Sequence, residues 1–210
     1  MSLSSELESL NAHAGSAARR VATRAIFFVT GMAMGLWAAL VPYAQLRTHS
    51  DAGDLGLLLL CLGAGSLLSM LGSGRIIGRF GCRVVIVAAV VLYCLMLPLL
   101  ALFSDIWLLA LSLFIFGMGI GLADVAVNVQ GTLVEQAADK PLMSGFHCLW
   151  SVGGIAGAGG GALLLSAGFS PLGSTFFAVV LVVIVTAWSF RGMLPFGAHE
   201  EESAEGKPEA

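Results

Sequence analysis

Charged residues are scarce in this sequence. Only 11% of its 210 residues are Asp, Glu, Lys or Arg, whereas 58% are hydrophobic. A soluble domain carries about 25% charged residues, so this chain has too few of them to cover a surface that faces water. The composition excludes an ordinary cytosolic enzyme, a nucleic-acid-binding protein and a disordered regulator. Glycine is abundant instead, with 27 residues, as is typical of membrane helices that pack closely.

Motifs for metal binding and catalysis are also missing. The four cysteines show no Cys-x-x-Cys pair and are expected to be small buried hydrophobic residues; they are Cys61, Cys82, Cys94 and Cys148. An intramembrane serine protease needs a serine and a histidine on separate helices, but Ser144 and His147 lie in one apolar run. We therefore expect no metal, no cofactor and no enzyme activity.

Long apolar runs predict helices that cross a membrane. A crossing needs ~20 apolar residues, whereas barrel strands alternate in polarity over about ten residues, a pattern that this sequence lacks. The runs lie at 22–44, 54–74, 84–103, 107–132, 142–167 and 172–190. The predicted fold is an all-α membrane protein with a bundle of six transmembrane helices over residues 21–192. The predicted flanking regions are an N-terminal cytoplasmic tail (1–20) and an acidic, disordered cytoplasmic tail (193–210).

The basic residues predict the orientation of the bundle. Of the ten Lys and Arg residues, Arg47 is alone on one side of the predicted membrane. The other nine lie on the opposite side: Arg19, Arg20, Arg24, Arg75, Arg79, Arg83, Lys140, Arg191 and Lys207. Because Lys and Arg concentrate in cytoplasmic segments, we expect both termini in the cytoplasm.

The run 107–132 and the residues just after it carry a stripe of small and polar residues. The stripe follows steps of three and four, which places its members on one helical face; they are Gly117, Gly121, Asp124, Asn128, Gly131 and Glu135. Two interpretations are open for this face. It is either a helix-packing surface with one carboxylate whose hydrogen bonds are made within the protein, or the wall of a water-filled cavity. An ionisable group inside a membrane marks a functional site by default, and packing alone needs only the glycines. Asp124 therefore favours the cavity.

The run 142–167 combines a packing motif with polar residues. Its ladder of small residues suits close helix contact and consists of Gly153, Gly157 and Gly161. His147 and Ser151 lie on the neighbouring face. At ~1.5 Å per residue, His147 is expected to lie closer to Asn128 than to Asp124. His147 is either a satisfied packing histidine or part of a proton relay.

Residues 72–83 read GSGRIIGRFGCR and resemble the cytoplasmic loop signature of the major facilitator superfamily, roughly G-x-L-a-D-R-x-G-R-R. The basic and glycine residues that support this resemblance are Gly74, Arg75, Arg79, Gly81 and Arg83. Gly81 is able to adopt the positive φ of a tight turn. Gly78 stands where the family has an Asp that latches the outward-facing state, and Cys82 replaces a basic residue. The resemblance does not extend to that latch.

Three further stretches resemble the L-fucose permease branch of sugar–proton symporters and its uncharacterised bacterial inner-membrane relatives. They are GLWAALVPYAQ (35–45), GMGIGLADVAVNVQG (117–131) and GFHCLWSVGG (145–154). The resemblance implies proton coupling by Asp124 and substrate binding by Asn128. The acid that the branch carries in its first span is absent, since Ala38 and Ala39 stand there. The resemblance therefore does not imply sugar specificity.

The resemblance implies one half of a transporter that normally has two six-helix halves around a midplane site. The chain matches the N-terminal half, with the acidic tail resembling the start of the central loop. A truncated or split gene product, a half that pairs with itself and a relic without transport are all possible. The expected function is proton-coupled transport of a small polar solute such as a sugar, with His147, Ser151 and Trp37 as further candidates for solute contact. The alternative for Trp37 is an aromatic residue that faces lipid or lies at the membrane interface. The alternative for the whole chain is a membrane interaction protein that does not transport.

Overall fold

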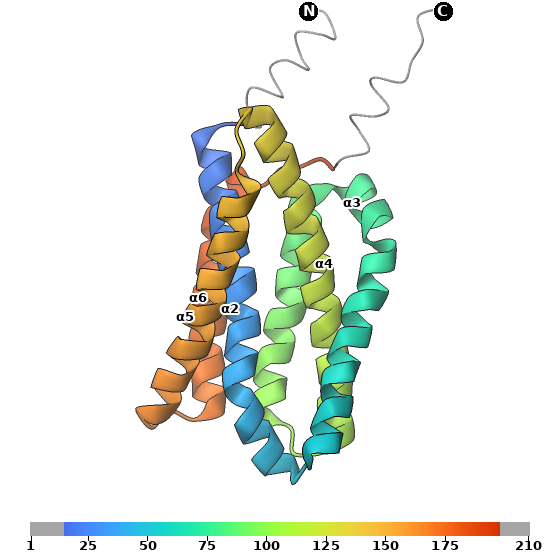
Figure 1. The fold of residues 1–210 in the computed structure, drawn as a ribbon, viewed down its shortest axis with the longest axis vertical. Helices are drawn as coiled ribbons and strands as arrows, with labels where there is room; N and C mark the ends of the chain where they lie inside the picture. The colour runs from blue at the N-terminus through green and yellow to red at the C-terminus, as the bar shows by residue number, and fades with distance from the viewer. Residues whose placement is uncertain (1–14, 198–210) are drawn as a thin grey trace, which may run out of the picture.

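The computed structural model describes residues 15–197, and these form five α-helices and one short 3₁₀ helix (Figure 1). The elements are α2 (Ala17–Thr48), α3 (Ala52–Leu102), α4 (Ile106–Ala138), α5 (Met143–Ser166), α6 (Pro171–Ser189) and the 3₁₀ helix η1 (Phe190–Gly192). All five α-helices are long and apolar enough to cross a membrane. The predicted all-α membrane architecture is confirmed. Residues 1–14 and 198–210, which include most of both predicted tails, lie outside the described residues.

The number of helices in residues 15–197 differs from the prediction of six. The runs 54–74 and 84–103 both belong to α3, whose 51 residues are helical on either side of Gly81. Gly81 has φ 77° and ψ 160°, a backbone conformation that is essentially restricted to glycine. The chain turns back at this point: the first arm (52–80) of α3 runs toward Gly81, and the second arm (82–102) returns toward the opposite end of the bundle (Figure 1). The positive φ expected at Gly81 is confirmed, but the expected interhelical loop is reduced to this one residue.

Capping side chains allow the helices to be joined by short turns. Asp51 and Asp54 form a reciprocal capping box at the start of α3. The Asp105 carboxylate accepts the N–H groups of the first turn of α4, and the Ser170 hydroxyl accepts the Gly173 N–H at the start of α6. Each cap satisfies backbone donors that a helix leaves unpaired at its N-terminus.

Glycines bring α2 and α5 into backbone contact. A Cβ atom on Gly31 or Gly35 of α2 would collide with a backbone carbonyl of α5, and a Cβ atom on Gly153 or Gly157 of α5 would collide with a carbonyl of α2. Similar contacts join α4 to the first arm of α3, through Gly65, Gly117 and Gly121. The close packing expected from the glycine ladder of α5 is therefore confirmed at Gly153 and Gly157.

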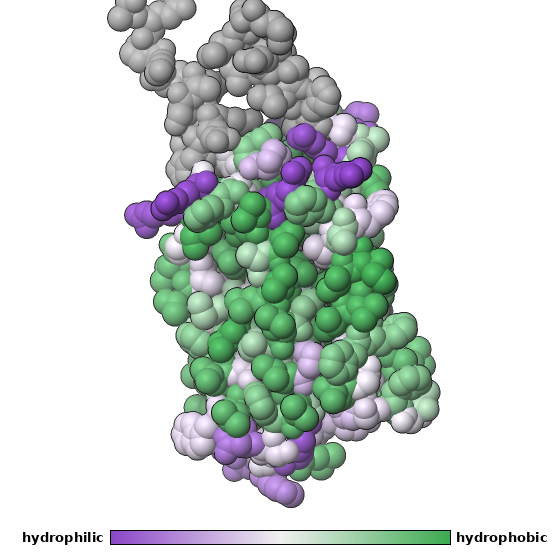
Figure 2. All heavy atoms as spheres, turned by 180° about the vertical axis from the view of Figure 1, so that it is seen from behind, coloured by the Kyte–Doolittle hydropathy of each residue, from purple (hydrophilic) through white to green (hydrophobic). Residues whose placement is uncertain are grey.

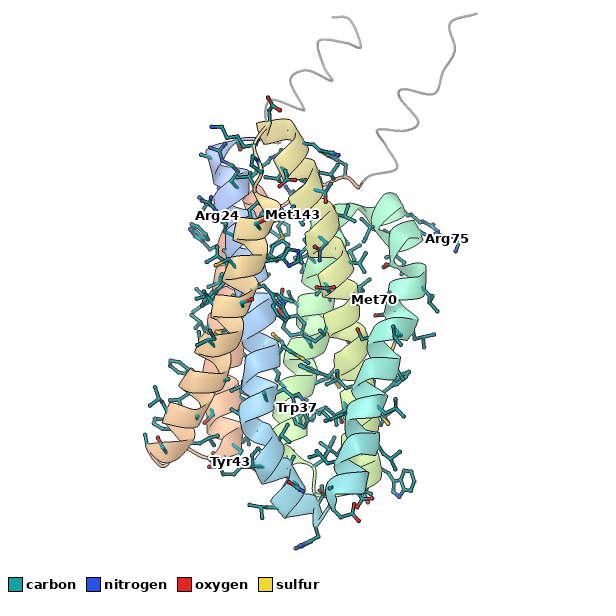
Figure 3. The ribbon with its side chains drawn as sticks, in the orientation of Figure 1. Arg24, Trp37, Tyr43, Met70, Arg75 and Met143 are labelled. Atoms are coloured by element: carbon teal, nitrogen blue, oxygen red, sulfur yellow. The ribbon has the colours of Figure 1, made fainter. Side chains whose placement is uncertain are left out.

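The surface has a hydrophobic band with polar groups at both ends (Figure 2). We call one end the basic end; of the described residues it carries Arg19, Arg20, Arg24, Arg75, Arg79, Arg83, Lys140 and Arg191. Arg24 and Arg75 lie toward this end in Figure 3, whereas Tyr43 lies toward the other. Arg47 at the opposite end donates to the carbonyls of Leu100 and Phe103, at the end of α3. Arg47 thus compensates carbonyls that this helix end leaves unpaired.

Residues Met193–Gly197, which we call the C-terminal strap, pack against the turn at Gly81. Met193 and Leu194 are fully buried. The N–H of Cys82 donates to the Phe196 carbonyl at 3.2 Å, and the N–H of Arg83 donates to the Leu194 carbonyl at 2.8 Å. The first five residues of the predicted tail are thus part of the packed bundle.

Candidate functional site

The polar centre of α4 is the Asp124–Asn128 pair. Both residues are half-buried. The Nδ2 group of Asn128 donates to the Asp124 backbone carbonyl at 2.8 Å and approaches the Asp124 carboxylate oxygen Oδ1 at 3.5 Å. One helical turn separates them, so the local backbone fixes their relation. Among the described residues this long contact is the only hydrogen bond of the carboxylate.

The glycines of the α4 stripe have packing roles. Gly117 and Gly121 contact the backbone of the first arm of α3, at Leu62 and Ser66. Gly131 contacts side chains of α2 and α5. These three glycines therefore support the interpretation of the stripe as a packing surface. The half-buried Asp124 and Asn128 lie between Gly121 and Gly131 on α4.

Glu135 caps the helix that follows it in the chain. Its carboxylate accepts the N–H groups of Leu142 at 2.5 Å and Met143 at 2.6 Å. The N-cap residue of α5, Leu142, makes no side-chain cap bond of its own. A negative charge at a helix N-terminus is favourable, so Glu135 holds the start of α5. The sequence placed Glu135 on the stripe but gave no indication of this role.

One face of α5 presents polar groups to the surroundings. Ser144, His147, Cys148 and Ser151 are exposed, so Cys148 is not the buried residue that we expected. The His147 ring meets Phe27 of α2 edge-on, with centroids 5.4 Å apart, and its backbone carbonyl accepts the Ser151 hydroxyl. Within residues 15–197 no hydrogen bond joins His147 to Asp124. The relative distances of Asn128 and Asp124 from His147 stay a prediction.

Trp37 belongs to the apolar core. Its side chain is only 2% exposed because its face of α2 packs into the bundle with Ala33, Leu36 and Leu40. The indole is therefore not lipid-facing, which corrects that alternative, whereas contact of Trp37 with a solute stays a prediction. Its Nε1 group has no partner among the described residues.

The loop-signature residues fall into two groups. Arg83 donates from Nε and Nη2 to the Met193 carbonyl, at 3.0 and 2.7 Å, and its guanidinium lies 5.1 Å from the Phe190 ring centroid. A Cβ atom on Gly81 would collide with the carbonyl of Pro195. Gly81 and Arg83 therefore hold the strap in place. The others face outward and are Gly74, Arg75 and Arg79.

Gln130 is a polar residue that the sequence did not single out as functional. It is fully buried. Its Nε2 group donates to the Thr23 hydroxyl at 3.0 Å, and its Oε1 atom accepts the Leu194 N–H at 3.2 Å. Gln130 thus joins α2, α4 and the strap. An amide side chain in an apolar run was the available signal, because a buried amide needs partners.

Comparison with known proteins identifies the family. A family model described as Major Facilitator Superfamily matches residues 25–209. The chain belongs to the major facilitator superfamily. Together with the five apolar helices, this membership makes it a multi-pass membrane protein.

Of three curated relatives of this major facilitator protein, two carry transporter names and the third is named a membrane protein. An uncharacterized MFS-type transporter of Yersinia pestis is 44% identical over 176 residues, which cover 84% of this chain and 46% of the relative. An uncharacterized transporter of Sinorhizobium fredii is 36% identical over 173 residues, covering 81% of this chain and 43% of the relative. The membrane protein MosC of Rhizobium meliloti is 29% identical over 131 residues, covering 62% of this chain and 32% of the relative. The chain spans less than half the length of each relative.

Proposed function

We propose that this chain is the N-terminal six-crossing half of a proton-coupled transporter for a small polar solute such as a sugar. The Asp124–Asn128 pair carries the proposal, because a carboxylate and an amide within a membrane helix are costly unless they serve a function. The two arms of α3, counted separately, bring the crossings to six. Coverage of 46% of the Yersinia relative and 43% of the Sinorhizobium relative supports a half.

In this proposal each polar group has a distinct role. Asp124 takes up and releases the coupled proton, and Asn128 hydrogen-bonds the solute. His147 and Ser151, exposed on α5, add polar contacts on the same path. An exposed histidine facing lipid would be costly, whereas a water-filled cavity between two halves provides the solvent that these groups need.

The proposal includes an orientation and a partner. Eight basic residues at the basic end favour the cytoplasmic side for that end and for both termini, in an inner membrane. A second six-helix half, or a second copy of this chain, completes the cavity. The resemblance to the L-fucose permease branch favours a sugar, although the acid which that branch carries in its first span is absent here.

The test is solute-driven proton movement in vesicles. The chain, together with any second half encoded beside it, is reconstituted with a pH-sensitive dye and challenged with neutral monosaccharides and polyols. We expect one solute class to drive alkalinisation or acidification, and Asp124→Asn to abolish it. The matched control is Asp54→Asn, which changes the same group in a capping box outside the bundle core. Asp124→Asn protein that folds and still couples protons to solute would overturn the proposal.

A second candidate is a non-transporting protein that associates with another membrane subunit. The outer face of α5 favours it, because a Cβ atom added to Gly159 or Gly160 would have no other atoms within 4 Å and small residues permit close approach of a partner helix. This function predicts a stable complex with another membrane protein and no solute-dependent proton movement in the vesicles.

A further inference from the structure

A groove on the outside of the bundle, at the basic end, is separate from the Asp124–Asn128 pair. It consists of two adjoining hollows that share Trp188 and Arg191 as lining residues. The first hollow has a volume of about 630 Å³ and lies between the second arm of α3 and α6. Its wall is mainly apolar, with Val87 and Val91 on one side and Val183 on the other.

The second hollow also has a largely apolar wall, but it carries the cationic groups of the groove. It also measures about 630 Å³ and lies between the start of α2 and the end of α6. Arg19 and Ser16 line it from α2, and Ser189 and Arg191 line it from the end of α6 and η1. The first turn of α2 contains no acidic residue, so its N-terminal partial positive charge adds to that of the two guanidinium groups.

Unpaired polar atoms are concentrated in this groove. Within residues 15–197, six buried side-chain polar atoms have no hydrogen-bond partner, and three of them belong to residues that line the two hollows. These are Nη1 of Arg19, Oγ1 of Thr186 and Oγ of Ser189. Ser189 is only 1% exposed. Because buried polar groups are nearly always paired in native proteins, the unpaired atoms of Arg19 and Ser189 at the second hollow indicate a ligand that supplies oxygen atoms there.

The charge of the groove indicates the sign of that ligand. No described carboxylate forms an ion pair with Arg19 or Arg191 among residues 15–197. Arg83 adds a further positive charge that acts on Arg19. Uncompensated guanidinium groups of this kind bind phosphate oxygens well.

We propose that the groove binds one anionic phospholipid. Arg19, Arg191 and the start of α2 hold the phosphate, and an acyl chain lies along the valines of the first hollow. A soluble phosphate would leave the apolar hollow unfilled, whereas a phospholipid fills both. Trp188 is 66% exposed and lies between the hollows, at the interfacial level where tryptophan is enriched in membrane proteins. Basic pockets between transmembrane helices are typical sites for anionic headgroups.

Another possible occupant is the chain's own acidic segment, residues 200–205. It contains Glu200, Glu201, Glu202 and Glu205. This segment has carboxylates for the cationic hollow but no acyl chain for the apolar one. The lipid is therefore the better match to the whole groove, and the test below distinguishes the two occupants.

Native mass spectrometry of the purified full chain tests the proposal. The protein is taken from nanodiscs of mixed phosphatidylglycerol and phosphatidylcholine, and the retained lipids are counted and identified. We expect one retained phosphatidylglycerol, held about tenfold or more tightly than phosphatidylcholine. Equal retention of both lipids would overturn the proposal.

Variants locate the site. The double variant Arg19→Gln/Arg191→Gln should lose the retained phosphatidylglycerol, whereas Arg75→Gln/Arg79→Gln, which removes the same charge from exposed positions at the same end, should keep it. Equal loss in both would show unspecific surface attraction and overturn the proposal. Val91→Trp fills the apolar hollow at an exposed position, leaves every charge in place and should also weaken retention. Normal retention by this folded variant would contradict the acyl-chain assignment.

The acidic segment has its own test. In a variant with all four glutamates of residues 200–205 changed to glutamine, we expect lipid retention to change less than about twofold, because the lipid already occupies the groove. A rise of about tenfold or more would show that the chain's own segment fills the groove, and would overturn the proposal.

Discussion

Replacement of Gly157 by alanine tests the role of glycine in the α2–α5 contact. A Cβ atom at this position would collide with the Met32 carbonyl and lie 2.9 Å from the Leu36 nitrogen, both of them backbone atoms of α2. A backbone has no rotamer with which to move aside, so the two helices must separate. Gly159, two residues further along α5, has nothing within 4 Å of the same atom. It is the matched control within the same helix.

The expected magnitude follows from the difference between these two positions. Alanine improves helix propensity at either site by about 1 kcal/mol, so this contribution cancels in the comparison. The remaining difference is the cost of overpacking a tight contact, typically about 1–3 kcal/mol. Gly157→Ala should therefore unfold with a free energy about 1–3 kcal/mol lower than Gly159→Ala.

The assay is reversible unfolding in mixed micelles, followed by circular dichroism as the fraction of denaturing detergent rises. Both variants are compared with the original chain under one set of conditions. If the free energies of unfolding of the two variants agree within about 0.5 kcal/mol, the backbone contact of α2 and α5 contributes nothing at this site, and the close packing of these two helices is refuted.

Three further predictions concern the basic end. Arg83→Lys replaces the two donors to the Met193 carbonyl by one, so amide hydrogen exchange over the strap should speed up severalfold; unchanged exchange would contradict the role of Arg83. Glu135→Ala leaves two N–H groups of α5 unpaired and should lower the free energy of unfolding by about 1–3 kcal/mol, whereas Glu135→Gln keeps an acceptor and should lose less. Equal losses would show that the cap is not the cause. Gly81→Ala should reduce the monodisperse fraction in size-exclusion chromatography, since φ 77° and ψ 160° do not suit alanine; Gly74→Ala, with open space around it, is the control that should behave normally.

Hydropathy alone located the membrane helices well. The N-terminal ends of α4, α5 and α6 lie within one residue of the predicted runs. At α4 and α6 this is because a polar capping residue, Asp105 or Ser170, interrupts the apolar sequence. The six predicted runs correspond to five α-helices within residues 15–197 for a specific reason. The polar, arginine-containing segment around Gly81 has the composition of a loop, but only Gly81 leaves the helical conformation.

The contacts made by individual side chains were harder to predict. Trp37 lies in a helix that is apolar on most sides, so periodicity did not separate the core-facing side from the lipid-facing side. The packing of the strap was not predicted because Met193–Gly197 directly precedes an acidic segment, and both were assigned to one disordered tail. Its apolar residues Met193, Leu194 and Phe196 were a usable signal for packing. Glu135 was missed because its partners are backbone groups of the next helix, which sequence spacing does not reveal.

Separating solute exchange from solute accumulation tests the central claim, proton coupling through Asp124, most directly. In vesicles, Asp124→Asn should retain exchange of labelled solute across the membrane at equal concentrations, because Asn128 still binds the solute. The same variant should lose accumulation driven by a pH gradient, while Asp54→Asn accumulates solute as the original chain does. Accumulation by Asp124→Asn that follows the pH gradient as in the original chain would contradict the assignment of Asp124.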